Sequence, residues 1–211
     1  MKKTIQNTLT LFLSLSIIGC GKIEEKKNEL STSVVEKALE TAGMPKMDTS
    51  NLTKLHESKV HFGFDYTQLE GIPEFKNPKG IINVSKEAIG VSILEDEKLS
   101  QEDYLSIMIA ISGDDLSSAK PIEGVIKNRE GNTANIGFTL MTQSGLIGYL
   151  AMEGDVKITK MSDEKAVLEL DVKMGGAMDA ESPEKWIPMK GKIEIENPVL
   201  VAVGAKLEDF M

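Results

Sequence analysis

The segment GDVKITKMSDEKAVLELDVKM, residues 154–174, decides the fold class of this chain. Apolar side chains alternate with polar ones before and after Ser162-Asp163-Glu164, and a period of two residues is typical of a strand with one buried face. Serine and aspartate favour turns, so the three central residues indicate a tight reversal. The segment therefore predicts two antiparallel strands joined by a short turn.

The same alternation recurs on both sides of this hairpin. Short apolar runs, separated by turns rich in Gly, Asp, Asn and Ser, lie at 60–66, 81–84, 89–93, 105–111, 122–128, 136–140, 146–152, 193–195 and 199–203. Residues 105–111 are apolar on both faces, which predicts a central strand. We expect an all-β fold of about ten strands, an antiparallel barrel or a strongly curled sandwich, forming a single β domain over residues 58–211.

One segment near the N-terminus has helical periodicity instead. Residues 31–43 place apolar side chains on one helical face, with Ser33 and Glu36 at capping-box spacing and Gly43 as a stop signal. We predict one N-terminal helix there. The dense mixed charge of residues 20–30 predicts a flexible tether, and residues 44–57 are expected to be loop-like.

The first twenty residues have the layout of an export signal. Two lysines follow Met1, an apolar stretch runs from Leu9 to Ile18, and Gly19 precedes Cys20, the single cysteine of the chain. The stretch is too short to span a bilayer, which takes about 20 residues. Ile17-Ile18-Gly19-Cys20 resembles the lipobox of bacterial lipoproteins, although Ile18 is bulkier than the residue usual at its position.

This resemblance implies an address and a modification. Residues 1–19 would be a lipoprotein signal peptide, removed by cleavage, and Cys20 would carry fatty acyl chains, palmitate among them, that hold the protein on a membrane. Gly21, where an aspartate would direct inner-membrane retention in enteric-type bacteria, favours the outer membrane. The chain as a whole resembles small all-β lipoproteins of the bacterial cell envelope, many of them uncharacterised, and we match it to no specific family.

Composition excludes several classes of function. The chain has a formal charge of -9, and loss of Lys2 and Lys3 with the signal would take it to -11. Such a charge disfavours nucleic acid as a partner, and Arg129, the one arginine, offers little for phosphate recognition. Aromatic residues make up 5% of the chain, so we expect an aliphatic core.

The residues of catalysis and metal binding are sparse. No G-x-S-x-G elbow, zinc pattern or phosphate loop occurs, and neighbouring carboxylates on strands point to opposite faces. We therefore predict no enzyme, no catalytic residues, no cofactor and no metal site. His56 and His61 with Met44 and Met47 would be the candidates for a copper site, but His61 alternates with core residues and should face solvent.

Trp186, the single tryptophan, lies in a long non-strand segment at 177–188. Such a residue anchors a partner or plugs one end of a barrel, and we select it as the candidate interaction residue. We expect a structural or protein-interaction lipoprotein that contacts another envelope protein. The alternative is a non-enzymatic carrier of a lipid or small hydrophobic ligand, and a hydrolase is disfavoured.

Overall fold

A computed structural model describes residues 50–96, 104–118, 120–127 and 130–211. The predicted helix at 31–43, the tether and Cys20 lie outside these residues. The described elements are the helix α3 (Ser50–Glu57) and the strands β1 (Lys59–Phe62), β2 (Pro78–Val84), β3 (Ala88–Glu95), β4 (Tyr104–Ser112), β5 (Ile122–Ile126), β6 (Thr133–Thr142), β7 (Gly145–Met161), β8 (Lys165–Gly176), β9 (Ile187–Glu196) and β10 (Val199–Ala202). Short 3-10 helices occur at Leu116–Ser118, Ala177–Asp179, Pro183–Lys185 and Leu207–Asp209.

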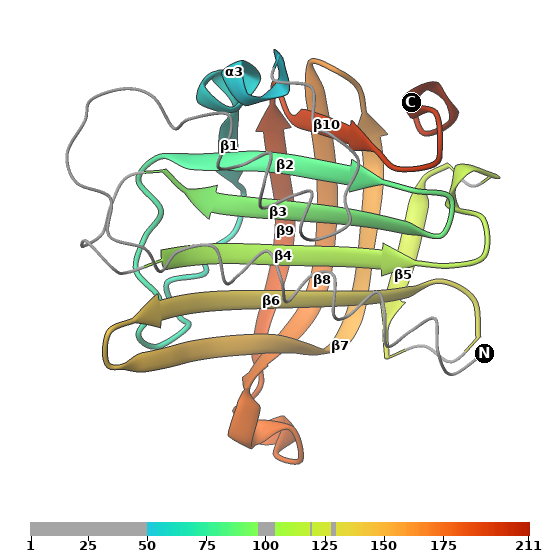
Figure 1. The fold of residues 1–211 in the computed structure, drawn as a ribbon. Coiled ribbons are helices and arrows are strands. Elements are labelled where there is room, and N and C mark those ends of the chain that lie inside the picture. The colour runs from blue at the N-terminus through green and yellow to red at the C-terminus, as the bar shows by residue number, and fades with distance from the viewer. Residues whose placement is uncertain (1–49, 97–103, 119, 128–129) are drawn as a thin grey trace, which may run out of the picture. The chain divides into compact units, whose positions relative to one another are not determined.

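The ten strands form one sheet that folds back on itself. Their order is β1-β9-β8-β7-β5-β6-β4-β3-β2-β10, with a further pairing between β6 and β7. The strands β2, β3, β4 and β6 make one layer, and β9, β8 and the second half of β7 cross behind it (Figure 1). The sheet is not closed, since β1 and β10 are its two ends. This confirms the all-β prediction and selects the curled sandwich over the barrel.

Two pairings depart from the antiparallel expectation. Strand β10 runs parallel to β2, and β5 runs parallel to β6 over a short stretch. Strand β10 follows β9 after only Asn197 and Pro198 and pairs with β2, which is distant in sequence, while β5 and β6 are consecutive strands that pair over two residue pairs. The hairpin-linked pairs β2–β3 and β7–β8 are antiparallel. The hairpin predicted from residues 154–174 is confirmed, and β4, between β3 and β6, is the central strand that its two apolar faces predicted.

Strand β7 carries the chain from one layer to the other. Residues 145–150 pair with β6, and its later residues pair with β5 and β8. Register shifts occur between Ala151 and Glu153 and between Ile158 and Lys160, and Gly154 adopts a φ of +116°. Bulges and glycine bends let one strand turn a corner between crossing layers. The sequence indicated two separate runs here, and the structure joins them into one bent strand.

The core lies between the layers and is mostly aliphatic, as composition predicted. The inward residues of β4 and β8 show the pattern: Leu105, Ile107, Ile109, Ile111, Ala166, Leu168, Leu170 and Val172 are all 3% exposed or less. Aromatic rings gather at one end of this core, where Tyr66 contacts Phe62, Phe75 and Phe138 at ring-centroid distances of 5.0 to 6.0 Å.

Two local predictions were wrong. Residues 50–57, expected as loop, form α3, which packs on β10 and β2. The Lys79 Nζ donates hydrogen bonds to the carbonyls of His56 and Ser58 at 2.9 and 3.0 Å, so a distant residue stabilises the helix end. The strand expected over 60–66 ends at Phe62. Beyond it, Phe64 and Tyr66 pack against each other through their rings without being part of a strand.

Candidate functional site: an uncharged sheet face

The outer side of the β9–β8–β7 layer carries most of the charge seen on the strands. Its outward side chains form ion pairs across neighbouring strands: Lys192–Glu169 at 2.8 Å, Lys173–Glu153 at 2.5 Å, Lys165–Glu194 at 2.5 Å, Lys157–Glu123 at 3.2 Å, and Lys190–Asp171. We name this outer side the charged face. The pairing follows from register, since Glu169 and Asp171 lie directly opposite Lys192 and Lys190.

The charged face behaves as a solvated surface. Lys192 lowers the pKa of Glu169, and Lys165 lowers the pKa of Glu194, in each case through a hydrogen bond and charge attraction. All these groups remain open to water, where such pairs add little stability. Their effect is to keep this side hydrated, as expected for an antiparallel sheet with one face in solvent.

The outer side of the other layer is different. Along β2, β3, β4, β6 and the start of β7, every second side chain points outward, away from the core. These outward positions, which we name the uncharged face, are Lys79, Ile81, Asn83, Ala88, Gly90, Ser92, Leu94, Tyr104, Ser106, Met108, Ala110, Ser112, Thr133, Asn135, Gly137, Thr139, Met141, Leu146, Gly148 and Leu150. Among them Lys79 alone is charged, and its ammonium group is bound to the carbonyls at the end of α3.

Exposure on the uncharged face rises toward β7. Leu146 is 68% exposed and Leu150 is 53% exposed, whereas Ile81 and Met108 are half-buried. Register sets Ile81, Ser92, Met108, Gly137 and Leu150 side by side in one row across five strands. In a chain with 27% charged residues, none of the five positions in this row is charged.

Trp186 lies beside this face rather than in the core. Its indole N–H donates a hydrogen bond to the Asp179 carbonyl at 2.8 Å, which joins the two ends of the loop between β8 and β9. A Cβ on Gly175 would lie 2.9 Å from the ring, and Gly175 is the direct partner of Leu150. Leu150 and the half-buried Trp186 therefore lie over the same side of the sheet, with Met178, 95% exposed, in the same loop.

Tyr104 shows that part of the uncharged face is withdrawn from water. It points outward from β4, yet burial raises its pKa to about 12. Its neighbour on the same side, Ser106, is 4% exposed. The phenol therefore stays neutral at physiological pH and adds no charge to this side of the sheet.

This pKa predicts a loss of stability at alkaline pH. Below pH 10 the phenol is neutral in both the folded and the unfolded chain, so it has no effect. Between pH 10 and 12 the unfolded chain ionises first, and the free energy of unfolding falls by about 1 to 3 kcal/mol. Urea titrations at pH 9 and 11.5 should show this fall relative to Tyr104→Phe, which titrates the same lysines but lacks the phenol. Equal losses in both proteins would contradict the assignment.

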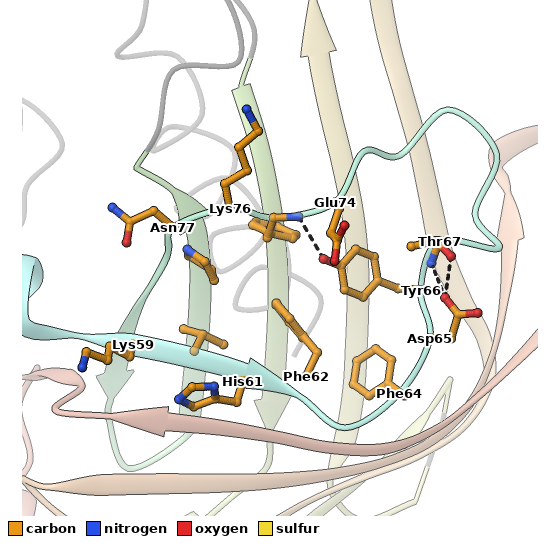
Figure 2. Close-up of a pocket in the computed structure, with 13 residues that line it drawn as sticks. Lys59, His61, Phe62, Phe64, Asp65, Tyr66, Thr67, Glu74, Lys76 and Asn77 are labelled. Carbon is orange, nitrogen blue, oxygen red and sulfur yellow. Dashed lines mark hydrogen bonds between the residues drawn. The ribbon is translucent and has the colours of Figure 1, made fainter.

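A second candidate site, which we name the aromatic groove, lies at the aromatic end of the core. It is a groove of about 580 Å³ between β1 and the segment 64–78. Figure 2 shows Phe62, Phe64 and Tyr66 at its floor, with Lys59, His61 and Glu74 around its rim. The Tyr66 hydroxyl accepts a hydrogen bond from the backbone N–H of Phe75 at 2.9 Å, and burial raises the Tyr66 pKa.

Two polar residues at the rim of this groove, Asp65 and His61, make local contacts. Asp65 accepts hydrogen bonds from the Thr67 amide and hydroxyl at 2.9 and 2.6 Å, which lower its pKa and make it a turn residue. His61 is exposed, as its alternation predicted, and lies 3.9 Å from Glu196. Chemically the groove offers apolar contact with a polar border.

The described residues assemble no metal centre from His, Cys, Asp and Glu. His56 lies exposed on α3, while Met44 and Met47, its proposed co-ligands, fall outside the described residues. Among the residues that the structure describes, no helix has the length and hydrophobicity needed to cross a bilayer.

Comparison with known proteins adds no family. No protein-family model, no curated protein and no solved structure matches the chain. The site is therefore defined by its own geometry.

Sequence reasoning missed the uncharged face, although its signal was present. The outward positions over 81–94, 104–112 and 133–150 lack Asp, Glu, Lys and Arg, whereas those over 153–173 and 188–196 are rich in them. Comparing the outward positions of the earlier strands with those of the later strands would have revealed the difference in charge. Recognising that the uncharged positions lie on one layer required the strand order.

Proposed function

We propose that this protein is a membrane-anchored cell-envelope lipoprotein with a structural or protein-interaction role, in which the uncharged face is the docking surface. The contrast between the two outer sides of the sandwich carries this proposal. One side has cross-strand ion pairs, and the other has an uncharged row ending in exposed leucines. An uncharged sheet surface with exposed leucines at one end supports a contact with another macromolecule.

The anchor supports the same role. The lipobox-like segment that ends at Cys20 would attach the protein to a membrane, with the outer membrane favoured by Gly21. Two or more acyl chains give durable attachment, since each buried methylene contributes about 0.8 kcal/mol. A charged tether over 20–30 then leaves the domain free to present its surface.

Cys20→Ala should abolish lipidation. In the native host, metabolic labelling with a palmitate analogue should mark the wild-type protein and leave the variant unlabelled, because the acylated thiol is gone. The wild-type protein should sediment with membranes, and the variant should lose this association. Ser182→Ala, which changes a half-buried loop serine and leaves Cys20 intact, is the control. An unlabelled wild-type protein would refute the anchor.

The interaction role is tested by photo-crosslinking in cells. A benzophenone amino acid at Met108, in the middle of the uncharged face, should give an adduct of higher mass. The same amino acid at Val167, outward on the charged face, should give far less. Absence of a Met108 adduct above the Val167 background would refute the docking role.

The aromatic groove favours a second candidate function, a carrier of a lipid or small hydrophobic ligand. The half-buried rings of Phe62 and Phe64 give it an apolar floor, and Lys59 and His61 at the rim suit an anionic head group. Native mass spectrometry of the protein purified from its own host tests this, since a carrier should retain a small molecule. The rings already pack on one another, which leaves the docking role better supported.

A further inference from the structure

We propose that the uncharged face binds the same face of a second copy of this chain, forming a two-fold symmetric dimer of sandwiches. This inference rests on the proposed interaction role and names its partner. A two-fold contact uses one patch twice, so the patch must be complementary to itself in shape and charge. The uncharged face meets both conditions.

Shape complementarity arises from the order of large and small side chains. In the row Ile81, Ser92, Met108, Gly137, Leu150, large residues alternate with small ones across the strands. Packed sheets interdigitate through this kind of alternation. A copy turned about a two-fold axis can place its large side chains over the small positions of the first.

A notch near the edge of the face provides a specific fit. Gly148 lies between the outward side chains of Leu146 and Leu150. A Cβ built on Gly148 meets no atom nearer than 3.8 Å, so the space above the backbone is open. An exposed leucine of the second copy fits such a notch.

The full extent of the face is at the lower limit for a stable dimer interface, about 600 Å² per partner. Five strands about 4.8 Å apart, each presenting up to nine residues of about 3.3 Å rise, cover roughly 600 Å² before side-chain corrugation is counted. Standard stable interfaces bury about 800 Å² per partner. Helix α3 lies at the β2 and β10 end and Ser106 within the face is buried, so exposure is greatest at the β7 end, at Leu146 and Leu150.

Net charge does not oppose this contact. The chain carries a formal charge of -9, which repels a second copy at long range. In the dimer, the charged faces lie outermost, and each is separated from the contact plane by the thickness of a two-layer sandwich, about 10 Å between layers. The resulting distance between them exceeds the Debye length of about 8 Å at physiological salt.

Sedimentation equilibrium tests the dimer directly. A chain starting at Gly21 retains the whole compact unit Ser50–Met211 and lacks the apolar signal. It should sediment as a dimer at micromolar concentration. Leu150→Lys should raise the dimer dissociation constant about 30-fold or more, since it replaces an exposed apolar side chain of the contact with a charge. Gly148→Ile, which fills the notch without crowding the monomer, should weaken the dimer similarly, and Val167→Lys on the charged face should leave it unchanged.

The outcomes separate this inference from the proposed function. A Met108 photo-adduct at twice the mass of the uncrosslinked protein in the same cells, containing only peptides of this chain, supports the dimer. An adduct with a different polypeptide overturns the dimer and keeps the docking role. A link at monomer mass to residues 31–43 overturns both. A monomeric wild-type chain at every concentration, or a dimer insensitive to both Leu150→Lys and Gly148→Ile, also overturns the inference.

Discussion

Gly154→Ala is expected to unfold the domain or to lower its free energy of unfolding by about 4 kcal/mol or more. A Cβ at this position would lie 2.1 Å from the Asp171 carbonyl oxygen and 2.6 Å from the Val172 Cα. Both contacts are with the backbone of β8, which cannot move without breaking its ladder to β9. The φ of +116° adds strain that only glycine avoids. Urea denaturation followed by far-ultraviolet circular dichroism measures the loss.

Gly145→Ala is the matched control for this variant. Gly145 also has a positive φ, +145°, but a Cβ there meets no atom within 4 Å. Its substitution should cost only backbone strain, about 1 kcal/mol. If both variants lost the same stability, backbone strain alone would explain the result. The close approach of Gly154 to the β8 backbone would then add nothing to the loss.

Phe138→Ala is expected to lower the free energy of unfolding by about 3 to 5 kcal/mol. Phe138 is 0% exposed and lies on β6 opposite Ile107 of the central strand. Its ring also contacts Tyr66 with a centroid distance of 6.0 Å. Removing it opens a cavity where the two layers and the aromatic groove meet, and the aliphatic neighbours cannot fill it. Differential scanning calorimetry or urea titration gives the change.

Phe138→Leu separates cavity formation from loss of the aromatic contact. Leucine keeps most of the volume, so its cost should stay near 1 to 2 kcal/mol. A Leu variant as unstable as the Ala variant would assign the effect to the ring contact with Tyr66 instead. If Phe138→Ala were nearly neutral, Phe138 could not be the centre of packing between the layers.

The two faces of the sandwich differ in what the proposed association would cost an acidic domain. The ion pairs of the charged face satisfy its carboxylates locally and keep that side hydrated. The uncharged face therefore offers the side with the smallest desolvation penalty for binding, because no charge there must leave water.

The strand pattern could be predicted because each strand buries one side locally. Alternation at 105–111, 136–140 and 166–172 reports which side chains enter the core, and the turn at 162–164 reports where the chain reverses. Helix α3 could not be predicted in this way. Its polar sequence gives little apolar signal, and its end is stabilised by Lys79, far away in the chain.

The sequence by itself determined the all-β class, the central strand, the aliphatic core and the solvent-facing position of His61. These follow from period-two burial, which is local along the chain. Only the tertiary structure decided that β7 bends through both layers, that the sheet stays open, that Trp186 lies beside Leu150, and that the uncharged positions of separate strands form one surface. These features depend on which strands become neighbours, and that choice is made by packing between residues distant in sequence.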